Sequence, residues 1–342
     1  MKSDTAILTI AIPTYNRAPK LRVQIDRLLP QLRPGVRLQI FDNGSSDTTR
    51  ELVESYGNCG VEYAPAKYNG GSGWNFSRCI SESQSEWVWV LSDDDPASST
   101  AVTDLLKVLH HQSCDFIHAS TPGGSYASDI VVSDLPSLFQ HTRFHLLLWI
   151  STGIYRTSSF LPLLDFLNDC ISTWSPQVMV VLRLLEAQKG KVLLSPVDLF
   201  GEPGGVPSWS PLELLIRISL APEHLADPAH QQLLAQDLFI SNYASMMLQG
   251  IKETTQVGGL RKWRRIRRQA AINLKSYYRG GVLKYIAGNW FMAGHRKKVL
   301  QLFYRLAILQ LLGFCPDFAF HRLAKTLPLS KTFMGGSPEE GQ

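Results

Sequence analysis

The residues best suited to chemistry are three consecutive aspartates, Asp93, Asp94 and Asp95, which follow the apolar run Val88–Leu91 after one serine. Three adjacent carboxylates repel one another at neutral pH, and a hard divalent cation takes oxygen ligands of this kind. The alternative is that they cap a helix starting at Pro96, because Asp is a good N-cap and Pro a good first helical residue. The triplet therefore predicts either a metal site or a helix cap.

Two further apolar runs also end in polar loops. The run Ile7–Ile12 breaks into Pro13-Thr-Tyr-Asn-Arg17, and Val36–Phe41 leads into Asp42-Asn-Gly-Ser-Ser-Asp-Thr48, a tight turn with a helix start behind it. In an open parallel α/β sheet, ligands bind beyond the carboxyl ends of the strands. We therefore expect the three polar loops to converge.

The elements that must position these loops alternate along the chain as strand and helix, the pattern of a parallel sheet. The stretch 121–131, rich in Gly and Ser, is interpreted as a loop. Predicted strands are 6–12, 36–42, 61–65, 86–92, 115–119 and 191–198, and predicted helices are 19–32, 48–56, 73–83, 99–111, 161–167 and 177–187.

Three motifs in this order, Ile12–Arg17, Asp42–Thr48 and Ser92–Asp95, resemble glycosyltransferase family 2, which has the GT-A fold. The resemblance covers roughly residues 5–200, and Lys67–Arg78 is similar to the O-antigen branch that contains abequosyltransferases. It implies a Rossmann-like, mostly parallel sheet flanked by helices. It also implies transfer of a sugar, with inversion, from a nucleotide-sugar to a glycan or lipid-linked acceptor in surface polysaccharide synthesis.

The resemblance assigns metal binding to Asp95, with Asp93 aiding it or contacting the nucleotide, and it leaves Asp94 open as an alternative. Mn²⁺ or Mg²⁺ held there would neutralise charge on the leaving diphosphate. Asp42 would bind the base or ribose, although it could also be only an Asx-turn residue. Tyr15 would stack on the base or simply occupy a surface turn. The full predicted donor site is Pro13, Thr14, Tyr15, Arg17, Asp42, Asn69, Asn75, Arg78, Asp93 and Asp94.

The catalytic base is the least well defined residue. An inverting transfer needs a group that takes the proton from the acceptor hydroxyl. Family members place a Glu-Asp pair before a helix, where this chain has Pro176 and Gln177, and an amide cannot act as a base. Asp169 is the substitute candidate, ahead of Asp165 and His118.

Charge divides the chain into an acidic and a basic part. Residues 1–250 carry 17 Lys and Arg against 25 Asp and Glu, whereas residues 251–342 carry 17 against 4. We predict a catalytic domain at 1–207 and a mainly α-helical basic region at 208–342. The cluster 261–268, with six cations in eight residues, indicates attachment to an anionic membrane surface. A solvated helical face and nucleic-acid binding are the alternatives, and no nucleic-acid motif accompanies the cluster.

Composition places the protein at the inner face of the cell membrane, as a cytoplasmic peripheral protein. Five scattered cysteines without paired spacing indicate reduced thiols, and no apolar stretch approaches the roughly 20 residues of a membrane span. Two other functions stay open. A nucleotidyltransferase would also pair carboxylates with a metal, and a degenerate partner protein would bind the nucleotide-sugar without turning it over.

Overall fold

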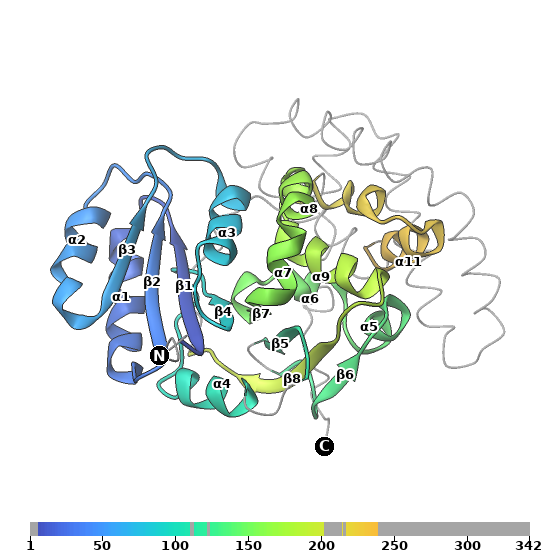
Figure 1. The fold of residues 1–342 in the computed structure, drawn as a ribbon, viewed down its shortest axis with the longest axis horizontal. Coiled ribbons are helices and arrows are strands. Elements are labelled where there is room, and N and C mark those ends of the chain that lie inside the picture. Colours follow the sequence, from blue (N-terminus) through green and yellow to red (C-terminus); the bar gives the residue numbers. More distant parts are fainter. Residues whose placement is uncertain (1–5, 110–112, 122–123, 202–213, 215–216, 239–342) are drawn as a thin grey trace, which may run out of the picture. The chain divides into compact units, whose positions relative to one another are not determined.

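The computed structural model describes residues 6–109, 113–121, 124–201, 214 and 217–238. Within these residues, eight strands form one mixed sheet: β1 (Leu8–Thr14), β2 (Val36–Asp42), β3 (Val61–Pro65), β4 (Trp87–Val90), β5 (Phe116–Ser120), β6 (Ile130–Val132), β7 (Gly153–Arg156) and β8 (Val192–Asp198). Their order across the sheet is β3-β2-β1-β4-β7-β5-β8-β6 (Figure 1).

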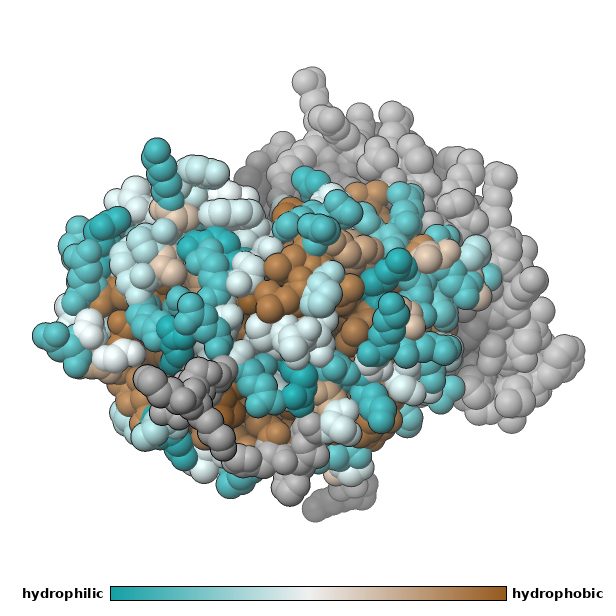
Figure 2. Space-filling model, viewed as in Figure 1, coloured by the Kyte–Doolittle hydropathy of each residue, from teal (hydrophilic) through white to brown (hydrophobic). Residues whose placement is uncertain are grey.

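Helices connect and cover the strands, as the alternating pattern predicts (Figure 1). In the described part of the chain they are α1 (Ala18–Leu28), α2 (Thr49–Ser55), α3 (Ser72–Ser81), α4 (Ala101–Leu109), α5 (Leu135–His141), α6 (Phe144–Leu147), α7 (Thr157–Phe160), α8 (Leu164–Asp169), α9 (Pro176–Glu186) and α11 (Pro228–Leu238). On the face in Figure 2, hydrophilic residues surround a hydrophobic area over α7 and α8.

The first half of the sheet is parallel and carries the predicted site. β1 pairs in parallel with both β2 and β4, and β2 pairs in parallel with β3. Residues of β4 are buried on both faces, as expected of a central strand with helices on each side. The register pairs Thr14 with Asp42, so β1 and β2 end at the same edge.

The second half of the sheet differs from the sequence prediction. β7 lies antiparallel between β4 and β5, and β6 pairs antiparallel with β8. β6 and β7 are short, and neither has the apolar run with a turn beside it that identified the equally short β4. The predicted loop 121–131 therefore ends inside β6, which begins at Ile130.

The chain that leaves β8 returns to the aspartate loop. Gly201 donates its backbone N–H to the carbonyl of Pro96, and Ser98 donates to the carbonyl of Leu199. Ala97 and Phe200 face each other across this short antiparallel bridge. The segment that follows the three aspartates is thus held by residues about a hundred positions further along the chain.

Two compact units divide the chain. One takes residues 1–207 and 224–230, and the other takes 208–223 and 231–342. The predicted division at residue 207 stays a prediction, and the predicted basic helical region lies largely outside the described residues. Among the helices that are described, none has the length and apolar character needed to cross a membrane.

Candidate active site

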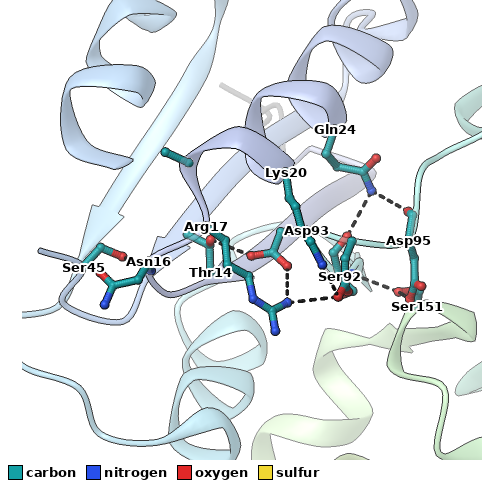
Figure 3. A network of polar contacts seen from close by, with 12 residues as sticks. Thr14, Asn16, Arg17, Lys20, Gln24, Ser45, Ser92, Asp93, Asp95 and Ser151 are labelled. Carbon is teal, nitrogen blue, oxygen red and sulfur yellow. Dashed lines mark hydrogen bonds and ion pairs between the residues drawn. The ribbon is translucent and has the colours of Figure 1, made fainter. Parts of the chain in front are cut away.

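The carboxyl ends of β1 and β4 bring two predicted motifs together (Figure 3). Thr14, the last residue of β1, donates its hydroxyl to Asp93 Oδ2 at 2.7 Å. Arg17, in the loop between β1 and α1, donates Nη1 to Asp93 Oδ1 at 2.8 Å. Pro13 lies one residue earlier, paired in register with Phe41. The predicted convergence of the first and third loops is therefore present in the structure.

Asp93 is the most enclosed of the three carboxylates. Its side chain is 2% exposed, and each of its oxygens accepts a hydrogen bond from Thr14 or Arg17. Burial raises the pKa of Asp93, while the charge of Arg17 and the hydroxyl of Thr14 oppose that rise. These contacts make Asp93 an anchor for Arg17, and its predicted role as a metal ligand stays a prediction.

Two cations pair with the ionised Asp94 side chain. Its Oδ2 lies 3.1 Å from Arg17 Nη1 and 3.3 Å from Lys20 Nζ, and its Oδ1 accepts the hydroxyl of Ser92. Burial is the largest influence and raises the pKa of Asp94, but the hydrogen bond from Ser92 and the two positive charges outweigh it and leave the pKa lowered. Asp94 is therefore ionised, with its charge balanced within the protein.

Asp95 differs from its neighbours because no cation pairs with it among the described residues. Its Oδ2 accepts hydrogen bonds from Trp149 Nε1 at 2.5 Å and from Ser151 Oγ at 2.6 Å. Burial raises the pKa of Asp95, and these two hydrogen bonds counteract part of the rise. No described donor reaches Oδ1, so one carboxylate oxygen is left for a ligand.

Gln24 fixes the backbone of the aspartate loop (Figure 3). Its amide nitrogen donates to the carbonyls of Ser92 and Asp95, and its amide oxygen accepts the N–H of Ala97. Gln24 lies on the buried face of α1, in step with apolar Leu21 and Ile25. A glutamine at such a position was the available sequence signal, and our sequence analysis missed it.

Other residues of the site gave no local signal. Lys20 lies one turn into α1 and reads as an ordinary surface cation. Trp149 and Ser151 lie more than fifty residues beyond Asp95, in a 3₁₀ turn and its approach, and no motif connects them with the aspartates. Only the fold brings them together.

Asp42 lies at the carboxyl end of β2 and is 2% exposed. Its Oδ1 accepts the N–H of Ser45, three residues on and not the two of an Asx turn, and its Oδ2 accepts the hydroxyl of Tyr63 at 2.7 Å. Burial, followed by the hydrogen bond to Asp42, raises the pKa of Tyr63. Tyr15 is 41% exposed, which leaves its ring accessible for stacking.

Three predicted donor residues bind the protein itself. Asn75 donates to the carbonyl of Phe41, and Arg78 donates to the carbonyls of Asp42 and Ala64 while its guanidinium lies over Trp74. Asn69 accepts hydrogen bonds from Asn43 and from the N–H of Gly71. These side chains hold the β2 end and the loop before α3 in place. Their contact with a donor stays a prediction.

The base candidates occupy contrasting settings. Asp169 is exposed at the end of α8, whereas Gln177 is 3% exposed in the first turn of α9, and its buried Oε1 has no hydrogen-bond partner in the described part of the chain. His118 is fully buried and hydrogen-bonded to Tyr126 and Thr152. Burial lowers its pKa to about 4, so it is a neutral structural residue at physiological pH.

The donor set suits a divalent ion shared with a ligand. Within the described residues, no group of three or more His, Cys, Asp or Glu side chains is arranged to hold a metal ion alone. Mg²⁺ usually binds one or two carboxylates together with substrate phosphates. Asp95, with one oxygen unused, fits that pattern, and Asp94 next to it is already balanced by Arg17 and Lys20.

Comparisons with known proteins agree with this geometry. Residues 9–161 match the model of Glycosyl transferase family 2. An uncharacterised glycosyltransferase of Rickettsia typhi (strain ATCC VR-144 / Wilmington) is 33% identical over 112 residues, which cover 32% of this chain. The match spans 35% of that relative, about a third of its length.

Two solved structures share the fold. S. aureus TarS 1–349, in complex with UDP-GlcNAc, aligns with a TM-score of 0.53 at 16% identity, over 82% of this chain and 92% of that one. The mannosyltransferase PcManGT from Pyrobaculum calidifontis, in complex with GDP-Man and Mn²⁺, aligns with a TM-score of 0.50 at 12% identity, over 91% and 88%. The described sheet and its helices therefore form a GT-A fold. In sequence, residues 9–161 of this chain are thus similar to a family 2 glycosyltransferase domain.

Proposed function

We propose that the protein is a metal-dependent glycosyltransferase that moves a sugar from a nucleotide-sugar to a glycan or lipid-linked acceptor, with inversion at the anomeric carbon. The observation that carries this proposal is the difference among the three aspartates. Asp93 and Asp94 are paired with Arg17 and Lys20, whereas Asp95 keeps one oxygen without a described partner. A donor diphosphate would bring a divalent metal ion, whose positive charge offsets the negative charge of the Asp95 carboxylate.

The residues around Asp95 have distinct tasks in this proposal. Asp95 holds Mn²⁺ or Mg²⁺, which supplies charge neutralisation for the leaving diphosphate. Arg17 and Lys20 lie beside the same carboxylates and offer cationic N–H groups to the phosphates. Asp42 binds the base or ribose, and Tyr15 stacks on the base. Structures with the same fold contain UDP-GlcNAc in one case and GDP-Man in another, which supports a nucleotide-sugar donor of either base.

The test is metal-dependent turnover. Asp95→Ala should abolish hydrolysis and transfer of nucleotide-sugars, because the diphosphate then meets Asp93 and Asp94 without a bridging cation. Asp104→Ala is the matched control, since Asp104 lies on α4 and its carboxylate contacts Lys107, away from the site. Full activity of Asp95→Ala in the presence of a chelator would contradict the proposal.

A second function, nucleotide-sugar binding without turnover, is favoured by one observation. The place where a carboxylate base is expected holds Gln177, whose Oε1 is buried and has no hydrogen-bond partner among the described residues. A binding protein would show metal-dependent thermal stabilisation by UDP- or GDP-sugars but no release of nucleotide. A transferase would show both, so the two readouts separate the functions.

A further inference from the structure

The contacts of Asp95 restrict which of its oxygens is available. Trp149 Nε1 and Ser151 Oγ both donate to Oδ2. An indole N–H can only donate. The Ser151 hydroxyl accepts the N–H of Ser92 at 2.9 Å, so its single proton is committed to Asp95 (Figure 3). Both donors are therefore oriented toward Oδ2 before any ligand arrives.

The segment that carries these donors is itself fixed. Trp89 Nε1 donates to the carbonyl of Ser151 at 2.7 Å, and Thr152 Oγ1 donates to the carbonyl of Trp149 at 2.6 Å. The Trp149 ring stacks on Phe200, with the ring centroids 5.8 Å apart. Ser151 is fully buried. Displacement of either donor would break several other contacts.

A proton count extends this support to His118. Because Thr152 gives its proton to Trp149 and the carbonyl of Leu146 can only accept, His118 Nε2 must carry the proton that faces Thr152 Oγ1 at 2.9 Å and Leu146 O at 3.2 Å. Nδ1 then accepts the hydroxyl of Tyr126 at 2.7 Å. The neutral Nε2–H tautomer of His118 thus holds the turn that presents Trp149 and Ser151.

We propose that Trp149 and Ser151 are positioning residues that limit Asp95 to a single metal-binding oxygen, Oδ1, and so make the site select Mn²⁺ or Mg²⁺ over Ca²⁺. This inference rests on the proposed function, because it concerns the metal used in sugar transfer. Mg²⁺ requires near-octahedral coordination, whereas Ca²⁺ takes six to eight oxygens and often binds a carboxylate through both.

Selectivity against Ca²⁺ follows from the free-energy cost of binding a metal through both oxygens of Asp95. Bidentate binding of Ca²⁺ would turn Oδ2 toward the metal and away from both donors. The buried hydroxyl of Ser151 and the indole N–H of Trp149 would then lack acceptors, and an unpaired buried donor is strongly unfavourable. Single-oxygen binding through Oδ1 leaves both hydrogen bonds intact.

The experiment measures Mn²⁺ and Ca²⁺ affinity by calorimetry, with UDP and, in parallel, GDP present. Trp149→Phe keeps an aromatic ring against Phe200 but removes the N–H, and Ser151→Ala removes the other donor. We expect each variant to lower the ratio of Mn²⁺ to Ca²⁺ affinity by about tenfold or more, the usual effect of losing a group that orients a metal ligand. Thermal melting checks that each variant is folded.

Trp87→Phe is the matched control. It also truncates a buried tryptophan to phenylalanine, but Trp87 lies on β4 under the guanidinium of Arg156. We expect its affinity ratio to equal that of the wild type. The inference is overturned if Trp87→Phe lowers the ratio as much as Trp149→Phe does, or if folded Trp149→Phe and Ser151→Ala leave the ratio unchanged. Failure of wild-type protein to bind metal and nucleotide would instead overturn the proposed function, and the inference with it.

Discussion

Individual carboxylates in this site are distinguished by their neighbours and not by their type. Asp93 is enclosed by Thr14 and Arg17, and Asp95 is held by two neutral donors. Asp42 also accepts two neutral hydrogen bonds, from Ser45 and Tyr63. An aspartate side chain can therefore pair with a cation, as Asp93 does, or accept only neutral hydrogen bonds, as Asp95 and Asp42 do. Substitutions at these positions should consequently affect different kinetic parameters.

Replacement of Asp42 should mainly weaken donor binding. Asp42→Ala removes an acceptor at the end of β2, and we expect a loss of about 1–3 kcal/mol in donor affinity, as for a buried hydrogen-bonded pair. Calorimetry with UDP or GDP and Mn²⁺ measures the loss. Tyr63→Phe is the control, because it keeps the carboxylate and removes only the hydroxyl that occupies Oδ2. An unchanged affinity for Asp42→Ala would exclude Asp42 from the donor site.

The predicted base can be tested by an isosteric change. If Asp169 takes the acceptor proton, Asp169→Asn should keep metal and donor affinity but lower kcat by roughly 10²- to 10⁴-fold. Gln177→Glu is the complementary variant, and we expect unchanged or lower activity because its buried environment disfavours a charge. A near-normal rate for Asp169→Asn would remove it from this role. A large gain for Gln177→Glu would indicate a weakened transferase.

At the scale of elements, strands and helices with a clear apolar pattern were predictable, and β6 and β7 were not. β2 and β3 have the predicted bounds, and α9 was placed within one residue at each end, because each carries a periodic or apolar pattern with a turn beside it. β7 has no such pattern, since its four residues are defined by pairing with β4 and β5. The contacts of Asp95 were unpredictable for the same reason, because they depend on where that pairing places Trp149.

Two buried histidines, His118 and His145, should make the free energy of unfolding depend on pH. Burial lowers the pKa of His118 to about 4, and burial followed by the charge of Arg143 lowers the pKa of His145 to about 4. The unfolded chain protonates both near pH 6.5, so it binds more protons than the folded protein as pH falls below that value. From pH 7 to pH 5 each histidine should therefore remove about 2 kcal/mol of stability.

Urea unfolding at pH 7 and pH 5 measures this dependence. His118→Gln retains a donor where Nε2 lies and cannot titrate, so the variant should lose less stability than the wild type over the same interval. Tyr126 is the titratable group in contact with His118, and its pKa is raised to about 12 chiefly by burial, so it stays neutral throughout. Equal losses in the wild type and in His118→Gln would show that folding does not lower the pKa of His118.

For the whole molecule, the strongest expectation concerns the basic region. The cluster 261–268 lies outside the described residues, and its proposed role is attachment to anionic membrane. Changing Arg264, Arg265, Arg267 and Arg268 to Gln should remove about 1 kcal/mol of binding per charge at low salt. Co-sedimentation with vesicles containing anionic lipid measures the effect.

A second variant controls for net charge. Four exposed cations of the catalytic domain, Arg22, Arg50, Lys67 and Lys107, can be changed to Gln together, which alters net charge equally. We expect this variant to bind vesicles as the wild type does, and wild-type binding to weaken with added salt. Binding that does not change with lipid charge or ionic strength would instead favour the alternative, in which the basic region is a solvated face of an ordinary helical bundle.

The bridge between Ala97 and Phe200 has a consequence for the newly made chain. During synthesis, Asp95 leaves the ribosome long before Trp149 and Phe200 exist, so its loop at first lacks the partners that define its shape. Contacts over such long sequence distances form late and slow folding. The parallel half of the sheet can therefore assemble first, and the ligand-ready conformation of Asp95 should arise only after β8 has been translated. A ribosome-bound chain that stops before β8 should have a nearly complete parallel half of the sheet but should lack the bridge that holds the segment after Asp95.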